Sequence, residues 1–234
     1  MGSPLPKVLT LVKTIWSENF AHRRVAPMSV HATTSKPGRS RAQKSANRRD
    51  ELVDSALVTL GELGFARTSL REIAANSTFS HGVVHYYFSD KAELIIASVR
   101  RYKATCVTRY DDVVASATTP DELVTGFAAK LAETIVDDAA MHRLWYDLRT
   151  QSMFDEAMRH DVLEIDASLE SMIQRVLARY AELSDTSLTV PSATAYAMLD
   201  GIFERALLRH IAGVDGVLDD LKATTIKLLP RLFA

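Results

Sequence analysis

Residues 68–94 read TSLREIAANSTFSHGVVHYYFSDKAEL, which is the most informative segment of the chain for its secondary structure. It contains three helix-start signals in succession. Ser69 and Glu72 form a capping box, in which the two side chains satisfy backbone amides at a helix N-terminus. Ser80 is placed to cap a second helix, and another capping box begins at Asp90. The stretch therefore predicts two short helices, from about 69 and 80, and a longer helix from 90.

Apolar residues at helical spacing flank this stretch on both sides. Upstream, 3–4–3 spacing predicts a helix over 46–63 from Val53, Ala56, Leu60 and Leu63. Gly64 is expected to end it. Downstream, spacings of three and four from Ile95 to Val113 predict one straight helix of five turns. Further helices are predicted over 121–136, 139–152, 154–183, 192–213 and 216–232. Because few runs alternate with period two, the chain is predicted to be all-α.

Composition bounds the class of protein. The 234 residues are 47% hydrophobic and include one cysteine, which excludes an intramolecular disulfide and a multi-cysteine zinc site. No run of 18 apolar residues exists, so no membrane span is expected. Residues 6–20 are partly apolar but lack a small-residue cleavage site, so no secretory signal is expected. We predict a cytoplasmic protein.

Charge is distributed unevenly. Residues 1–50 carry ten Lys or Arg and two acidic residues, a net +8 within a chain of net −1. Residues 1–46 are predicted to be a flexible basic arm, because 29–45 are polar and rich in Pro, Gly and Ser. This arm is either a solvated tail, with Met28 a possible start of the natural chain, or a segment that lies on DNA phosphates and continues into Arg48.

The segment after the arm has the organisation of a helix-turn-helix. Val84, Tyr87 and Phe88 are expected to face inward, and the other side of that helix carries Gly82 and Val83. Small residues on an exposed face are unusual against water but fit against base edges and thymine methyl groups. His85 and Tyr86 are placed to donate to phosphates. Double-stranded DNA is therefore the expected partner.

These residues, in this order and spacing, resemble the TetR family of repressors. The resemblance covers about residues 48–95 and implies an all-helical protein. It implies a helix-turn-helix DNA-binding domain at 47–92, a ligand-binding and dimerisation domain at 93–234, an operator, a small-molecule effector and a homodimer, with no cofactor. It assigns DNA contacts to Arg48, Ser69, Ser80, His81, Gly82, Val83, His85, Tyr86 and Lys91. Two departures stand out: Thr78 replaces a glycine in the turn, and His85-Tyr86 reverses the usual order.

Two features of this region have an alternative interpretation. His81 and His85 lie four residues apart and are a possible metal pair, but no third ligand is near them in sequence. We predict no metal site. Cys106 lies on an apolar helix stripe, which favours a packed small residue over a redox switch.

Aromatic and polar residues in the C-terminal part are candidates for an effector pocket. They are Tyr102, Cys106, Tyr110, Phe127, Trp145, Tyr146, Arg149, Met153, Asp200 and Phe203. Asp200 lies within the apolar run 193–211, so its carboxylate must pair with an arginine or bind a ligand. Pairing is the favoured interpretation.

The segment 192–213 is apolar around most of its predicted helix, whereas a surface helix needs only one apolar stripe. We predict that it forms a homodimer seam through Phe203 and Leu207, together with a second stripe on 154–183.

The expected function is a repressor released from its operator by an effector. The alternatives are a helical enzyme that uses residues 145–154 and Asp200, and a DNA-binding protein without an effector. The chain shows no phosphate-binding loop and no nucleophile elbow, which disfavours the enzyme.

Overall fold

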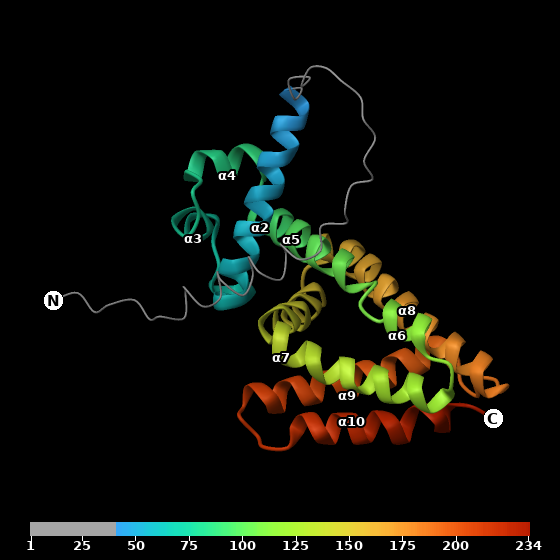
Figure 1. Cartoon of the computed structure of the whole chain (residues 1–234). Helices are drawn as coiled ribbons and strands as arrows, with labels where there is room; N and C mark the ends of the chain where they lie inside the picture. Colours follow the sequence, from blue (N-terminus) through green and yellow to red (C-terminus); the bar gives the residue numbers. More distant parts are fainter. Residues whose placement is uncertain (1–40) are drawn as a thin grey trace, which may run out of the picture. The chain divides into compact units, whose positions relative to one another are not determined.

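The computed structural model describes residues 41–234, and the prediction for the first 40 residues of the arm lies outside this range. Every regular element in it is a helix, with one isolated β-bridge between Leu188 and Phe233. The elements are α2 (Arg41–Arg67), α3 (Leu70–Ala75), α4 (His81–Tyr87), α5 (Lys91–Cys106), α6 (Asp111–Ser116), α7 (Pro120–Ser152), α8 (Glu156–Ser184), α9 (Ser192–Ile211), α10 (Val217–Leu228) and the 3-10 helix η1 (Leu229–Leu232). The all-α prediction is confirmed (Figure 1).

The predicted caps are present at the short helices. The Ser69 hydroxyl accepts from the Glu72 amide at 3.2 Å, and the Glu72 carboxylate accepts from the Ser69 amide at 2.7 Å. The Asp90 carboxylate accepts from the Glu93 amide at 2.9 Å. The second box is modified, because the Glu93 carboxylate accepts from the amide and hydroxyl of Ser89. These bonds satisfy backbone amides that have no partner within their helices.

Helices α2 to α5 enclose a small core. Helix α3 packs against α4 and α2, and α5 packs along α2 (Figure 1). The fully buried side chains of this core include Leu52, Leu60, Ile73, Val84, Phe88, Leu94 and Ile95. Two bounds of α2 differ from prediction. The helix begins at Arg41, within the predicted arm, and continues to Arg67 past a break at Gly64, where φ is 74°.

The prediction of one long helix from residue 90 to 113 is wrong. Helix α5 ends at Cys106, a turn covers 107–110, and α6 follows. The turn directs Arg109 inward, where its Nη2 lies 2.5 Å from Asp138 Oδ2, and buries Tyr110 edge-to-face against Phe127. Residues 121–136 and 139–152 also join into one helix, α7, in which the predicted break survives as a non-helical Asp138.

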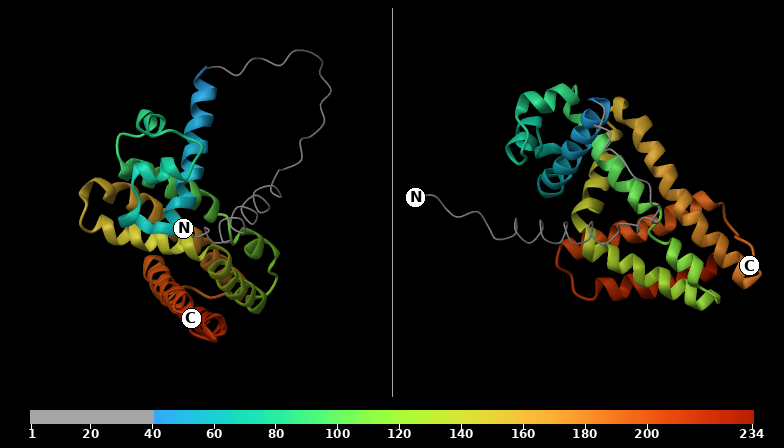
Figure 2. Two further views of the ribbon diagram at one scale, coloured as in Figure 1. Left: turned by 90° about the vertical axis from the view of Figure 1, so that its left-hand side faces the viewer. Right: turned by 45° about the horizontal axis from the view of Figure 1, so that its top comes forward.

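The C-terminal helices form the larger core. Helix α7 packs against α8, α9 and α10, and α9 and α10 run side by side (Figures 1 and 2). Gly213 and Gly216 both have φ of 73° and shape the turn between α9 and α10, as a conformation open to glycine allows. None of the helices within 41–234 is long and apolar enough to cross a membrane.

Candidate functional site

Helix α4 has one buried and one exposed side. Val84 and Phe88 are buried, and Tyr87 is half-buried. The opposite side exposes His81, Gly82, His85 and Tyr86, with Val83 half-buried among them. Tyr86 is 79% exposed, a large value for an aromatic residue. The inward and outward sets agree with the prediction, although contact with DNA stays a prediction.

The turn between α3 and α4 accommodates Thr78 without strain. No residue from 76 to 80 has a positive φ, so glycine is not required there. Ser77 stabilises the turn, because its hydroxyl donates to the Ala74 carbonyl at 3.1 Å and accepts from the Phe79 amide at 3.1 Å. The departure from the family pattern at Thr78 therefore leaves the helix-turn-helix intact.

The predicted phosphate-binding cations lie beside aromatic rings. Lys91 Nζ lies 4.3 Å from the Phe65 ring centroid, and burial lowers the Lys91 pKa while the charges of Asp147 and Glu72 oppose that shift. The Arg48 guanidinium carbon lies 5.3 Å from the Phe79 centroid. Both cations are therefore in contact with an aromatic ring, and their binding to DNA phosphates stays a prediction.

The histidine pair of α4 is a local contact. His81 Nε2 and His85 Nε2 lie 3.2 Å apart with their rings edge-on. Residues 41–234 contain no group of three or more His, Cys, Asp or Glu able to hold a metal ion. Both histidines lie on the exposed side of α4, where their ring nitrogens can form hydrogen bonds.

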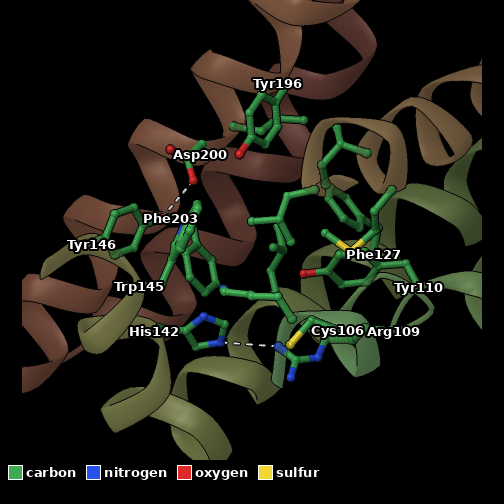
Figure 3. Close-up of a pocket in the computed structure, with 16 residues that line it drawn as sticks. Cys106, Arg109, Tyr110, Phe127, His142, Trp145, Tyr146, Tyr196, Asp200 and Phe203 are labelled. Carbon is green, nitrogen blue, oxygen red and sulfur yellow. Dashed lines mark hydrogen bonds between the residues drawn. The ribbon is translucent and has the colours of Figure 1, made fainter. Parts of the chain in front are cut away.

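A cavity of about 60 Å³ lies among α5, the turn after it, α7, α8 and α9 (Figure 3). Seven predicted pocket residues line it: Cys106, Tyr110, Phe127, Trp145, Tyr146, Asp200 and Phe203. Tyr102 is buried but does not line the cavity. Arg149 does not line it either, although its guanidinium pairs with Asp200 and lies 5.8 Å and 5.6 Å from the ring centroids of Trp145 and Tyr146. Met153 does not line it. Because α7 ends at Ser152, the Met153 side chain turns outward and is 70% exposed.

Asp200 is held by two partners. Arg149 Nη1 lies 2.6 Å from its Oδ2, and the Tyr146 hydroxyl donates to Oδ1 at 2.8 Å. Burial, followed by the adjacent Asp200 charge, raises the pKa of Tyr146, so its hydroxyl stays protonated and donates. The prediction that an arginine pairs with Asp200 is confirmed.

Three basic residues of the cavity were missed from the sequence: Lys103, Arg109 and His142. His142 Nε2 accepts from Arg109 Nη1 at 3.2 Å, and burial followed by the charges of Lys103 and Arg109 lowers the His142 pKa well below its usual value. The contacts of Arg109 were missed because the sequence predicted a straight helix that continues past residue 106. Lys103 had a signal, because it lies four residues after Val99 and three before Cys106 on the apolar stripe.

Comparison with known proteins identifies the N-terminal unit. Residues 52–97 match the family described as bacterial regulatory proteins, tetR family. The regulator BetI of Paraburkholderia phymatum is 28% identical over 167 residues, which cover 69% of this chain and 82% of that protein. The chain belongs to the TetR family. It is a DNA-binding transcriptional regulator. These matches favour this function over the alternative of a helical enzyme.

Solved structures of transcriptional regulators share the fold. FadR from Bacillus subtilis, in complex with stearoyl-CoA, matches with a TM-score of 0.62 and 16% identity, covering 77% of this chain and 96% of that one. A TetR transcription regulator from Haloarcula marismortui matches with a TM-score of 0.66 and 19% identity, covering 81% of this chain and 100% of the other. The match extends well beyond the helix-turn-helix into the C-terminal helices.

Proposed function

We propose that this chain is a homodimeric repressor whose α4 binds an operator and whose cavity binds a small effector that lowers operator affinity. The observation that carries the proposal is the position of α5. This helix begins at Lys91, directly after the helix-turn-helix, and Lys103 and Cys106 in its last turn line the cavity. At a rise of 1.5 Å per residue, Lys91 and Lys103 are separated by roughly 18 Å along one helix.

A second connection supports the same coupling. Arg143 Nη2 donates to the Gly61 carbonyl at 2.5 Å, and the Phe65 amide donates to Asp147 Oδ2 at 2.8 Å. Both bonds join α7 to the end of α2. Trp145, on the same part of α7, lines the cavity. A ligand that displaces this part of α7 therefore acts on α2 as well as α5.

Operator recognition would use the exposed side of α4. Gly82 and Val83 leave room for base edges, and His85 and Tyr86 supply donors toward phosphates. In a two-fold dimer the two α4 helices would enter half-sites roughly 34–36 Å apart. An effector that favours another spacing lowers operator affinity by its differential binding to the two states.

The predicted dimer seam needs correction. Phe203 and Leu207 are buried in the subunit's own core, and so is the apolar stripe of α8. The outer side of α9 instead exposes Met198, Leu208 and Ile211, with Leu208 67% exposed. The side-by-side α10 exposes Ile226. Two-fold dimers are typical of TetR-family regulators, and we place the contact on this α9–α10 surface.

Selection of DNA from a random pool tests the function. The full chain should enrich one palindromic sequence, and Val83→Glu should abolish that binding because it places a carboxylate against base edges. Val83→Thr is the matched control, since it keeps the shape of valine without adding charge, and it should bind much more tightly than Val83→Glu. Enrichment of no sequence, or equal operator affinity of both variants, would contradict the proposal.

A further inference from the structure

Lys103 is a buried cation without an anion. Its side chain lines the cavity, and the residue is 4% exposed. Within the described part of the chain, no hydrogen-bond acceptor or carboxylate lies within bonding distance of Nζ. Two aromatic rings lie beside the ammonium group, with Nζ 5.6 Å from the Tyr102 centroid and 5.2 Å from the Trp145 centroid. Ring faces compensate a buried charge only in part.

A second donor in the same wall also has no partner. The indole Nε1 of Trp145 is buried, and no acceptor bonds to it anywhere in residues 41–234. Buried donors are normally paired, because an unmade hydrogen bond costs the full desolvation of the group. Lys103 and Trp145 both line the cavity, so its lining contains two donors that no acceptor of the described residues satisfies.

The other charged groups of the cavity already have partners. Arg109 pairs with Asp138 and donates to His142. At the opposite end, Arg149 and Tyr146 satisfy Asp200. The remaining lining is largely apolar and includes Phe127, Leu131, Leu169, Met172 and Phe203. The polar groups of the cavity that lack a partner are therefore both hydrogen-bond donors, the Lys103 ammonium and the Trp145 indole N–H, and the first is a cation.

We infer that the effector is a carboxylate with an apolar body, whose oxygens accept from Lys103 Nζ and Trp145 Nε1. This inference rests on the proposed function, because it takes the cavity to be the effector site. A cationic ligand would meet the Lys103 charge, and a neutral one would leave it uncompensated. The cavity of about 60 Å³ is far smaller than the roughly 300–1,000 Å³ of drug-sized sites. The apolar body must therefore move the walls, and one wall is α5.

Fluorescence of Trp145 gives a direct assay. The chain has two tryptophans, so Trp16→Phe leaves Trp145 as the sole reporter. Octanoate, octan-1-ol and octylamine share one apolar chain and differ in the head group, and each is titrated into the full chain at pH 7. Octanoate should bind at least about tenfold more tightly than octanol, which is the equivalent of about 1.4 kcal/mol, and octylamine should bind more weakly than octanol.

Substitutions assign the preference to Lys103. Lys103→Met should bring octanoate and octanol to similar affinities, because the cation is lost and the apolar volume is kept. Lys130→Met is the matched control. Lys130 is a solvent-accessible lysine on α7 that pairs with Glu133 at 2.5 Å, so this variant should keep the full preference.

A pH series on the unmodified Lys103 gives a second measurement that does not depend on a variant folding. Burial lowers the pKa of Lys103 to about 8, and octanoate stays ionised throughout. The preference for octanoate should therefore fall by up to about tenfold per pH unit above 8, whereas octanol binding stays nearly constant. The titratable or charged groups around Lys103 are Tyr102, Cys106, Arg109, Asp138, His142 and Asp200.

The outcomes separate this inference from the proposed function. Equal affinities of octanoate and octanol, a preference that survives Lys103→Met, or no binding of any probe at millimolar concentration would each overturn the carboxylate inference. Operator affinity is measured in parallel without ligand. If operator binding is intact while the octanoate preference is absent, the inference alone fails. If no operator is bound, the proposed function fails first.

Discussion

Lys103→Met should make the empty protein more stable. Burial lowers the pKa of Lys103 from about 10.5 to about 8, so the folded state disfavours the charged form that prevails at pH 7. A difference of 2.5 pKa units, at 1.36 kcal/mol per unit, amounts to about 3 kcal/mol. Methionine has a similar length, is unbranched and carries no charge, so we expect the variant to gain roughly this free energy of unfolding.

The pH dependence of the gain has a defined sign. Because the folded pKa of Lys103 lies below the unfolded one, the cost of the lysine is fully present below pH 8 and disappears as pH rises toward 10.5. The advantage of the variant should be about 3 kcal/mol at pH 7 and about 1 kcal/mol at pH 9.5. Urea unfolding at both pH values, at one protomer concentration, measures it. A variant less stable than wild type at pH 7, or an advantage unchanged at pH 9.5, would show that the buried Lys103 charge does not destabilise the folded state.

The remaining predictions concern the dimer, DNA and the Asp200 pair. Leu208→Glu should give folded monomers in sedimentation and lose operator binding, whereas Leu207→Glu should unfold by circular dichroism, because Leu207 is 3% exposed. Lys91→Ala should weaken binding to all DNA sequences similarly and reduce the salt slope by about one; an unchanged slope would show that Lys91 touches no phosphate. Asp200→Asn should lower the free energy of unfolding by about 1–3 kcal/mol in urea, because Arg149 loses the nearer of its two carboxylate partners in a partly exposed site and keeps Asp166 at 3.9 Å.

Local signals made the DNA-binding part predictable. The Ser69 and Asp90 caps depend on residues three positions apart, and both are present in the structure. The inward side of α4 follows from helical periodicity alone, and Val84 and Phe88 are buried as expected. Such features do not require knowledge of what lies elsewhere in the fold.

Features that depend on distant partners were missed. After α5 ends at Cys106, Arg109 pairs with Asp138, a carboxylate 29 residues away in the sequence. On α9, Leu207 and Leu208 are adjacent and equally apolar, yet the first packs inward and the second is exposed. When a helix is apolar around most of its circumference, the sequence does not indicate which of its sides packs against α7 and α8. Lys103 was overlooked because a lone lysine on an apolar stripe is an unusual binding group.

The shared helix α5 has a consequence for how different promoters would respond. In the proposed mechanism α5 couples the two sites, and thermodynamic linkage then requires that the factor by which an effector weakens DNA binding equals the factor by which DNA weakens effector binding. Protein bound at a strong operator therefore needs a higher concentration of effector for release than protein bound at a weak one. A single repressor with this architecture would switch on its target genes in sequence as the effector accumulates, in the inverse order of their operator strength.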